Sequence, residues 1–176
     1  MKLEITAYLG LGSNQGDREA NLRESLDRLD NTEGIKLSRH SSIYLTEPVG
    51  VSRQTDFYNA AAEIKTTLSP HDLLSEVKKI EYGMGREPNN HFRPRPIDID
   101  ILLYGDSEID TLDLLIPHSR LARRAFVLIP LLEINPDITH PTSFRSLKEY
   151  LDEIGGSQKV ERVINAGDFT GKLSES

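Results

Sequence analysis

Residues 96–104 form an apolar run with the composition of a buried β-strand, yet the run contains two carboxylates, Asp98 and Asp100. Side chains alternate faces along a strand, so these two point the same way, roughly 7 Å apart along the backbone. Two carboxylates that share an apolar-walled site repel each other unless a cation lies between them. The pair therefore predicts a site that binds something positively charged.

Three arginines precede this run, at Arg86, Arg93 and Arg95. Carboxylates are ligands for Mg²⁺, and guanidinium groups hold phosphate oxygens through paired hydrogen bonds. Acids and arginines so close in sequence therefore predict a magnesium-held polyphosphate and an enzyme of phosphoryl-type transfer.

The alternative is that the two aspartates lie on a solvated outer face of the sheet. The residues of the opposite face are expected to be core: Ile97, Ile99, Ile101 and Leu103. The aspartate face continues as Leu102 and Tyr104, so this face is not expected to be fully exposed to solvent. This pattern favours the functional interpretation.

The chain has 176 residues, a formal net charge of −7 and no cysteine. This length fits one domain with a real core. The acidic charge argues against nucleic-acid binding, and the lack of cysteine excludes disulfides and thiolate metal sites. Without an apolar signal sequence or a membrane-length apolar run, we expect a cytoplasmic protein that binds no membrane. We also expect a monomer that acts on small molecules.

The order of predicted elements is β-α-β-β-α-β, which fits an α+β, ferredoxin-like fold with a mainly antiparallel sheet and helices packed on one face. The strands are expected at 5–11, 35–45, 57–66 and 96–104, and the helices at 17–29 and 69–84. An apolar run at 126–134 predicts a further helix, bent or started by Pro130. The glycines at 155 and 156 predict a domain over 1–154, followed by a partly flexible C-terminal extension over 155–176.

Gly10 and Gly12 follow the first predicted strand and invite comparison with a dinucleotide-binding loop. Position 15 is Gln where the third glycine belongs, and no Gly-Lys-Ser/Thr motif supports a P-loop. The glycines therefore predict a tight strand-to-helix turn.

Two further places on the chain carry polar or aromatic side chains of interest. Phe57 and Asn59 share one face of their strand and could stack a flat heterocycle and hydrogen-bond its edge, although core packing is the more common role for a phenylalanine such as Phe57. His118 lies on a loop rich in arginine, where it either meets a ligand or only hydrogen-bonds within the loop.

Taken together, several segments resemble the 6-hydroxymethyl-7,8-dihydropterin pyrophosphokinase family, and the resemblance covers about residues 8–141. The segments are Leu-Gly-Leu-Gly-Ser-Asn at 9–14, Tyr-Leu-Thr-Glu-Pro-Val-Gly at 44–50, Phe-Tyr-Asn-Ala at 57–60, Ile-Glu at 80–81 with Gly-Arg at 85–86, Arg-Pro-Ile-Asp-Ile-Asp-Ile-Leu-Leu-Tyr-Gly at 95–105, Ile-Pro-His at 116–118 and Arg-Ala-Phe-Val-Leu at 124–128, with Pro-Leu at 130–131. The resemblance implies that the pterin hydroxymethyl oxygen attacks the β-phosphorus of ATP, that AMP leaves, and that the product enters folate biosynthesis.

The resemblance also implies roles for individual residues. Asp98 and Asp100 would hold two Mg²⁺ ions and, with Arg86 and Arg95, would be the catalytic residues. The ATP-binding residues would be Leu74, Lys78, Glu81, Arg86, Phe92, Arg95, Ile101, His118, Ser119 and Arg124. The pterin-binding residues would be Thr46, Pro48, Val49, Phe57, Asn59 and Phe126.

The segment 87–95 departs from the family pattern, since Pro88 and Asn89 replace positions that are often basic and Arg93 stands where glycine is common. Arg93 would then restore the missing charge, and Phe92 would close over the site. Two other functions remain open: a regulatory module that binds a ligand without chemistry, and a metal-dependent nucleotidyltransferase or nuclease.

Overall fold

The computed structural model describes residues 3–47, 56–87 and 94–169. Its centre is an antiparallel sheet in which β1 (Ile5–Ser13) lies between β4 (Phe57–Thr66) and β5 (Asp98–Tyr104). The long strand predicted at 35–45 is instead two strands, β2 (Ile35–His40) and β3 (Ile43–Thr46), which both pair with β4.

The strand order is β5-β1-β4-β3-β8, with β2 also on β4, and every pairing is antiparallel. Strands β1 to β5 have the order of a ferredoxin-like sheet, as the predicted fold requires. The last, β8 (Val160–Ile164), adds an edge to the sheet beside β3. The region that sequence analysis places in a C-terminal extension thus contributes a strand to the main sheet.

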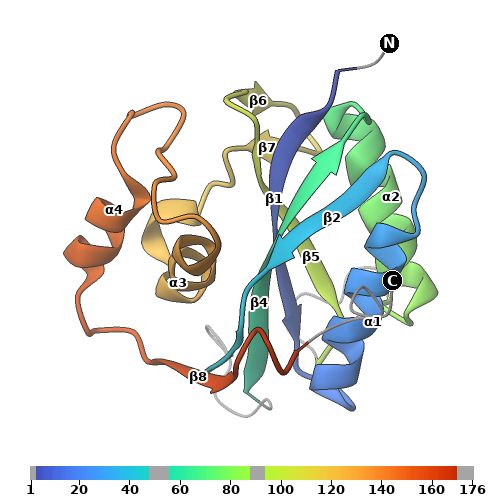
Figure 1. Ribbon diagram of the computed structural model, residues 1–176, viewed down its shortest axis with the longest axis horizontal. Coiled ribbons are helices and arrows are strands. Elements are labelled where there is room, and N and C mark those ends of the chain that lie inside the picture. The colour runs from blue at the N-terminus through green and yellow to red at the C-terminus, as the bar shows by residue number, and fades with distance from the viewer. Residues whose placement is uncertain (1–2, 48–55, 88–93, 170–176) are drawn as a thin grey trace.

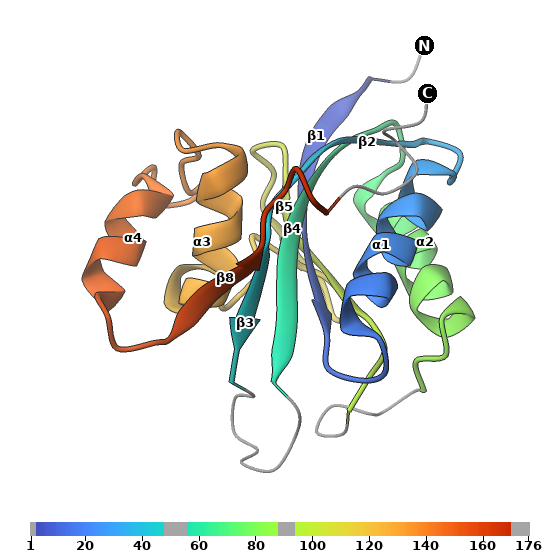
Figure 2. The same cartoon turned by 60° about the horizontal axis from the view of Figure 1, so that its bottom comes forward.

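Helices cover both faces of the sheet, so the prediction of helices on one face only was wrong. Figure 2 shows α1 (Arg18–Asp30) and α2 (Pro70–Gly83) on one side, and α3 (Ala125–Ile134) and α4 (Leu147–Ile154) on the other. The whole arrangement is seen in Figure 1, where the short hairpin of β6 and β7 lies at one end of the sheet. The remaining elements are β6 (Ile109–Asp110), β7 (Leu115–Ile116) and the 3₁₀ turn η1 (Leu121–Arg123).

The helices on the first face begin at residues that cap them. Asp17 accepts a hydrogen bond from the Ala20 N–H, and Ser69 accepts one from the Asp72 N–H with proline at the first helical position. Such caps satisfy N–H groups that have no partner within the helix. The helix α3 begins at Ala125, so Pro130 lies within it and does not start it.

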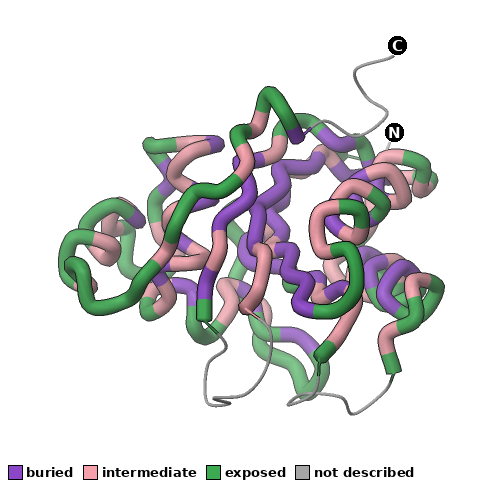
Figure 3. Tube along the Cα trace, turned by 90° about the horizontal axis from the view of Figure 1, so that it is seen from below, coloured by how far each residue is buried: buried purple, intermediate pink, exposed green. Residues whose placement is uncertain are grey.

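Each face of the sheet has its own hydrophobic core. Leu22 of α1 and Val77 of α2 pack on the first face, and Leu128 of α3 and Leu147 of α4 pack on the second. Figure 3 shows the buried segments gathered in the sheet and on the sides of the helices that face it. Within the described part of the chain, no helix combines the length and apolar composition that crossing a membrane requires.

The predicted alternation along β5 fails at its end because the strand contains a β-bulge. The pairing with β1 shifts register so that Leu9 lies opposite Ile101 and Tyr8 opposite Leu103. Leu102 is the extra residue, and a bulge turns the residues after it to the other face. Leu103 is therefore buried in the second core, with α3, and Tyr104 packs against the first core, with the isoleucines. The faces predicted for Leu103 and Tyr104 were thus both wrong.

Glu133 of α3 joins the second helical layer to β3 of the sheet and to the residue that precedes it. Its carboxylate accepts hydrogen bonds from the backbone N–H of Ser42, the hydroxyl of Ser42 (2.8 Å) and the hydroxyl of Tyr44 (2.6 Å). Burial acts to raise the pKa of Glu133, but the bonds from Tyr44 and Ser42 outweigh it and the pKa is lowered. Burial and this same contact raise the pKa of Tyr44 to about 12.

We predict that Glu133→Ala lowers the free energy of unfolding by about 2 kcal/mol, because it leaves partly buried donors without a partner. Chemical denaturation near pH 7 measures the loss. The exposed Glu33→Ala, whose side chain has no hydrogen bond in the described structure, is the control and should change stability by less than about 0.5 kcal/mol.

The effect of Glu133→Ala should depend on pH in a stated direction. A carboxyl whose folded-state pKa is lowered stabilises the fold fully above its unfolded pKa, and this contribution is lost as the pH falls through the folded value. The difference between wild type and variant should therefore narrow below about pH 4.5. A difference that grows on acidification would contradict the assignment.

Candidate active site

A cavity of about 740 Å³ lies on the second face of the sheet, between the strands and α3. Thirteen of the predicted site residues line it: Thr46, Phe57, Asn59, Lys78, Glu81, Arg86, Arg95, Asp98, Asp100, His118, Ser119, Arg124 and Phe126. Residues from five separate parts of the chain are thus brought to one place. The prediction that both aspartates face one shared cavity agrees with the geometry.

Two glycines form the floor of the cavity beside the aspartates. In the pairing of β1 with β5, Gly12 lies opposite Asp98 and Gly10 opposite Asp100. A side chain at Gly12 would place its Cβ 3.0 Å from Asn59 Oδ1 and 3.5 Å from the Phe57 ring. Gly10 and Gly12, which invited comparison with a dinucleotide-binding loop, thus leave space in the cavity that side chains would fill.

Asp98 is held by both predicted catalytic arginines. Arg86 Nη1 lies 2.6 Å from Asp98 Oδ1, and Arg95 Nε lies 3.2 Å from Asp98 Oδ2. The two guanidinium groups are mostly buried, with side-chain exposures of 11% and 15%. An ion pair screened from water in this way is stronger than one on the surface, so Asp98 fixes the position of both arginines.

Arg95 is also fixed through its backbone to the end of β1. Asn14 Oδ1 accepts a hydrogen bond from the Arg95 N–H (2.8 Å), and the Asn14 N–H donates to the Arg95 carbonyl (3.2 Å). The guanidinium lies 5.2 Å from the centre of the Phe57 ring, a cation–π distance. Asn14, at the end of the Gly-Leu-Gly-Ser-Asn segment, thus fixes the backbone of Arg95.

Asp100 is the second carboxylate, and it is open to the cavity although protein surrounds it on most sides. Burial, followed by the negative charge of Asp98, raises the pKa of Asp100. The positive charges of His118, Arg124 and Lys78 act in the opposite direction. A cation placed between the two carboxylates would remove this repulsion.

Glu81 of α2 lies next to the pair and is almost fully buried. Its Oε2 accepts a hydrogen bond from the Ile99 N–H (2.8 Å), while Oε1 has no hydrogen-bond partner and lies 3.6 Å from Lys78 Nζ. Burial is the main reason that the pKa of Glu81 is raised. Through Ile99, Glu81 anchors the backbone between the two aspartates.

The other end of the cavity is aromatic and polar. Asn59 Nδ2 donates a hydrogen bond to Thr46 Oγ1 (2.6 Å), which orients the amide beside Phe57. On α3, the guanidinium of Arg124 lies 5.3 Å from the centre of the Phe126 ring. Flat rings and an oriented amide suit an aromatic heterocycle with hydrogen-bonding edges.

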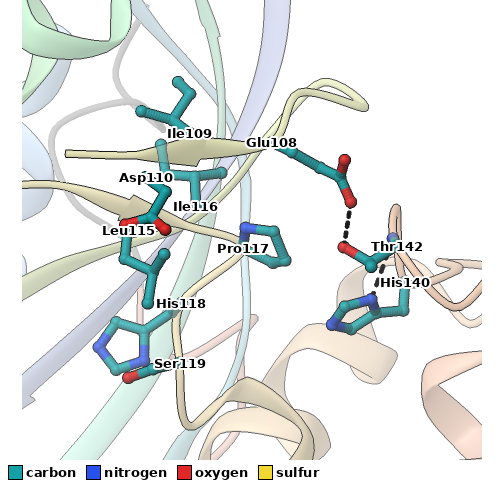
Figure 4. Close-up of a pocket in the computed structure, with 10 residues that line it drawn as sticks. All are labelled: Glu108, Ile109, Asp110, Leu115, Ile116, Pro117, His118, Ser119, His140 and Thr142. Atoms are coloured by element: carbon teal, nitrogen blue, oxygen red, sulfur yellow. Dashed lines mark hydrogen bonds between the residues drawn. The ribbon is translucent and has the colours of Figure 1, made fainter.

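His118 and Ser119 lie between this cavity and a second one of about 360 Å³. Figure 4 shows the smaller cavity between the β6–β7 hairpin and the loop that carries His140. A hydrogen bond from Thr142 to Glu108 joins the hairpin to that loop. The His118 N–H of the backbone donates to the Leu102 carbonyl, which fixes the loop to the end of the bulged strand.

Some predicted site residues are not brought to the cavity. Ile101 is buried in the core on the opposite face of the sheet, and Leu74 packs against that same core. Pro48, Val49, Phe92 and Arg93 lie outside the described residues. Arg120 and Glu47 line the cavity but were not predicted; the arginine-rich loop around His118 was the available signal for Arg120.

The fold and the cavity together indicate a class of protein. A ferredoxin-like sheet bears a paired-carboxylate site with arginines on one side and a flat apolar site on the other. Among the described residues, no group of three or more acidic or histidine side chains is placed to hold a metal ion. These features are those of an enzyme that acts on a phosphate compound and a flat heterocycle.

Comparison with known proteins identifies the family. Residues 8–136 match the family described as 7,8-dihydro-6-hydroxymethylpterin-pyrophosphokinase (HPPK). A 2-amino-4-hydroxy-6-hydroxymethyldihydropteridine pyrophosphokinase of Aquifex aeolicus is 41% identical over 148 residues, covering 84% of this chain and 91% of that protein. The chain belongs to the HPPK family, and its reaction class is ATP-dependent pyrophosphoryl transfer to a hydroxymethyldihydropterin in folate biosynthesis.

Some relatives are longer. The Folate synthesis bifunctional protein of Arabidopsis thaliana is 48% identical over 196 residues, and the match covers 98% of this chain but 40% of that protein. A solved structure of Plasmodium falciparum HPPK-DHPS has a TM-score of 0.70 at 16% identity, covering 86% of this chain and 46% of that one. That likeness confirms the fold.

We predict that Gly12→Ala raises the KM for the hydroxymethyldihydropterin by about tenfold. The added methyl group would displace Asn59 or Phe57, and overpacking of this kind costs typically about 1–3 kcal/mol. Steady-state kinetics with varied pterin measures the effect. Gly156→Ala, where the added atom meets open space, is the control. An unchanged KM in a folded Gly12→Ala enzyme would show that Gly12 and its neighbours Asn59 and Phe57 do not contact the pterin.

Proposed function

We propose that this chain transfers the diphosphate of ATP to the hydroxymethyl group of 6-hydroxymethyl-7,8-dihydropterin through the residues of the larger cavity. The pterin hydroxyl oxygen forms a bond to the β-phosphorus, the bond from that phosphorus to the oxygen shared with the α-phosphate breaks, and AMP leaves. The observation that carries the proposal is the placement of Asp98 and Asp100 in one cavity with Arg86 and Arg95.

The donor set fits Mg²⁺. Asp98 and Asp100 offer hard carboxylate oxygens on one face of β5, and Mg²⁺ is commonly bound by one or two carboxylates together with substrate phosphates. When bound, two Mg²⁺ ions would neutralise charge on the phosphate oxygens and make the hydroxyl easier to deprotonate. Asp98 and Asp100 hold these ions, and neither needs to act as a strong base.

The arginines change partners when the nucleotide binds. In the structure Arg86 and Arg95 neutralise Asp98. Phosphate oxygens offer both guanidinium groups a partner of higher charge, which leaves Asp98 free to bind a metal ion. Arginines held so close to their final position lose little freedom on binding, and they stabilise the charge that develops on the transferred group.

Phe57, Asn59 and Thr46 on the sheet, together with Phe126 on α3, bind the pterin. Phe57 and Phe126 provide flat apolar surface, and Asn59, oriented by Thr46, hydrogen-bonds the edge of the ring. Lys78, His118, Ser119 and Arg124 bind the nucleotide. All these groups come from a single chain, so we propose that the enzyme acts as a monomer.

The rival functions lack support from this site. A regulatory module would explain a pocket but gives no role to two carboxylates beside two buried arginines. A nucleotidyltransferase would use similar carboxylates, but it would attack the α-phosphorus and release diphosphate. The product therefore distinguishes these reactions.

The test is to incubate the protein with ATP, Mg²⁺ and 6-hydroxymethyl-7,8-dihydropterin and to separate the nucleotides by chromatography. We expect AMP and pterin diphosphate in equal amounts and no ADP. Formation of ADP, or of free diphosphate, would overturn the proposal.

We predict that Asp98→Ala and Asp100→Ala each reduce turnover more than tenfold at saturating Mg²⁺, while the protein stays folded. Both side chains face the cavity and contribute little to core packing. Product formation measures turnover, and circular dichroism checks the fold. Asp106→Ala, an exposed turn residue, is the control. More than a tenth of the wild-type rate in either variant would contradict the metal-binding role.

A further inference from the structure

Gln158 lies on the segment between α4 and β8, outside the region matched by the HPPK family, and its side chain reaches the start of α3. Gln158 Oε1 accepts a hydrogen bond from the Ala125 N–H (2.8 Å), and Gln158 Nε2 donates one to the Arg123 carbonyl (2.9 Å). One amide group therefore holds the backbone on both sides of Arg124.

The start of α3 has no cap of its own. Arg124 occupies the N-cap position and makes no capping hydrogen bond, because its side chain has only donors. The first N–H groups of a helix have no partner within it, and a side-chain oxygen normally accepts from one of them. Gln158 provides that oxygen from 33 positions along the chain.

The first turn of α3 carries two residues of the larger cavity, Arg124 and Phe126. In the described structure neither Arg124 nor its neighbour Arg120 forms an ion pair, and the two positive charges repel each other. No carboxylate lies within ion-pair distance of Arg124 in the described structure, although Asp100 and Asp98 attract it from farther away. The backbone that Gln158 holds therefore contributes to the position of Arg124.

The segment after Gln158 is anchored on the opposite wall of the cavity. In the pairing of β8 with β3, Val160 lies opposite Thr46, the residue that orients Asn59. Figure 2 shows β8 running beside β3 after the chain leaves α4. Further along, the Ala166 N–H donates to the Ser42 hydroxyl, and Phe169 is fully buried in the first core. A short stretch of chain thus connects the Thr46 wall to the Arg124 wall.

We propose that Gln158 is a positioning residue that sets Arg124 and Phe126 against the opposite wall, so that nucleotide and pterin bind at the correct separation. The proposal rests on the function proposed above, and it assigns part of the substrate affinity to the C-terminal segment. Gln158 itself touches neither substrate.

The experiment compares wild type with Gln158→Ala and Gln158→Met in the full-length chain. Methionine keeps the length of the side chain but removes the donor and the acceptor. Lys159→Ala is the matched control, because Lys159 is the next residue, is exposed and makes no side-chain hydrogen bond in the described structure. Gln158 is itself exposed, so neither variant removes core packing.

We expect both Gln158 variants to raise the KM for ATP and for the pterin about fivefold or more, with a smaller change in kcat. The reason is that both variants lose the two hydrogen bonds that hold the backbone around Arg124. Melting curves should show the variants fully folded at the assay temperature. Unchanged KM values, or a loss of activity that follows only the unfolded fraction, would overturn the proposal.

Hydrogen exchange of the Ala125 amide provides a readout that needs no catalysis. The exchange should be slow in wild type and in Lys159→Ala, and at least fivefold faster in both Gln158 variants. Equal exchange rates in all four proteins would overturn the proposal even if the enzyme makes AMP. If the Gln158 variants exchange faster but the wild-type protein makes no AMP, the proposed function is refuted, while the structural role of Gln158 at the start of α3 is supported.

Discussion

The charge of Asp98 is the constraint on which the site depends. A carboxylate near the end of a buried strand must be neutralised, and Arg86 and Arg95 do this at 2.6 and 3.2 Å. The two guanidinium groups are mostly buried and line the cavity. Under the proposed function, Asp98 would bind a metal ion when substrate arrives, and Arg86 and Arg95 would then bind phosphate oxygens instead.

The ferredoxin-like sheet makes this arrangement possible by bringing three strands into one row. Asp98 of β5, Gly12 of β1 and Asn59 of β4 lie side by side, and the middle residue has no side chain. The floor of the cavity is therefore low at its centre, with the acid on one side and the amide on the other. Under the proposed function, the phosphate and the pterin would bind at the two ends of this cross-strand row, so that one cavity could serve both substrates.

The sequence predicted the features that depend on local pattern. Alternation placed Asp98 and Asp100 on one face because β5 is regular up to Ile101. The same rule failed at Leu103, because the bulge depends on pairing with β1. Ile101 was expected at the nucleotide from the resemblance, yet alternation already placed it on the other face. The second helical layer was missed because α3 is apolar on nearly all sides, and Gln158 was missed because its partners lie 33 and 35 residues away.

The most direct measurement of the central claim is the number of divalent ions that the acid pair holds. Mn²⁺ can replace Mg²⁺ and be counted by electron paramagnetic resonance, with a non-hydrolysable ATP analogue bound to the enzyme. The account predicts two ions per chain with the analogue, and the loss of both sites in an enzyme that carries Asp98→Ala and Asp100→Ala together. Two ions bound equally well by that double variant would contradict it.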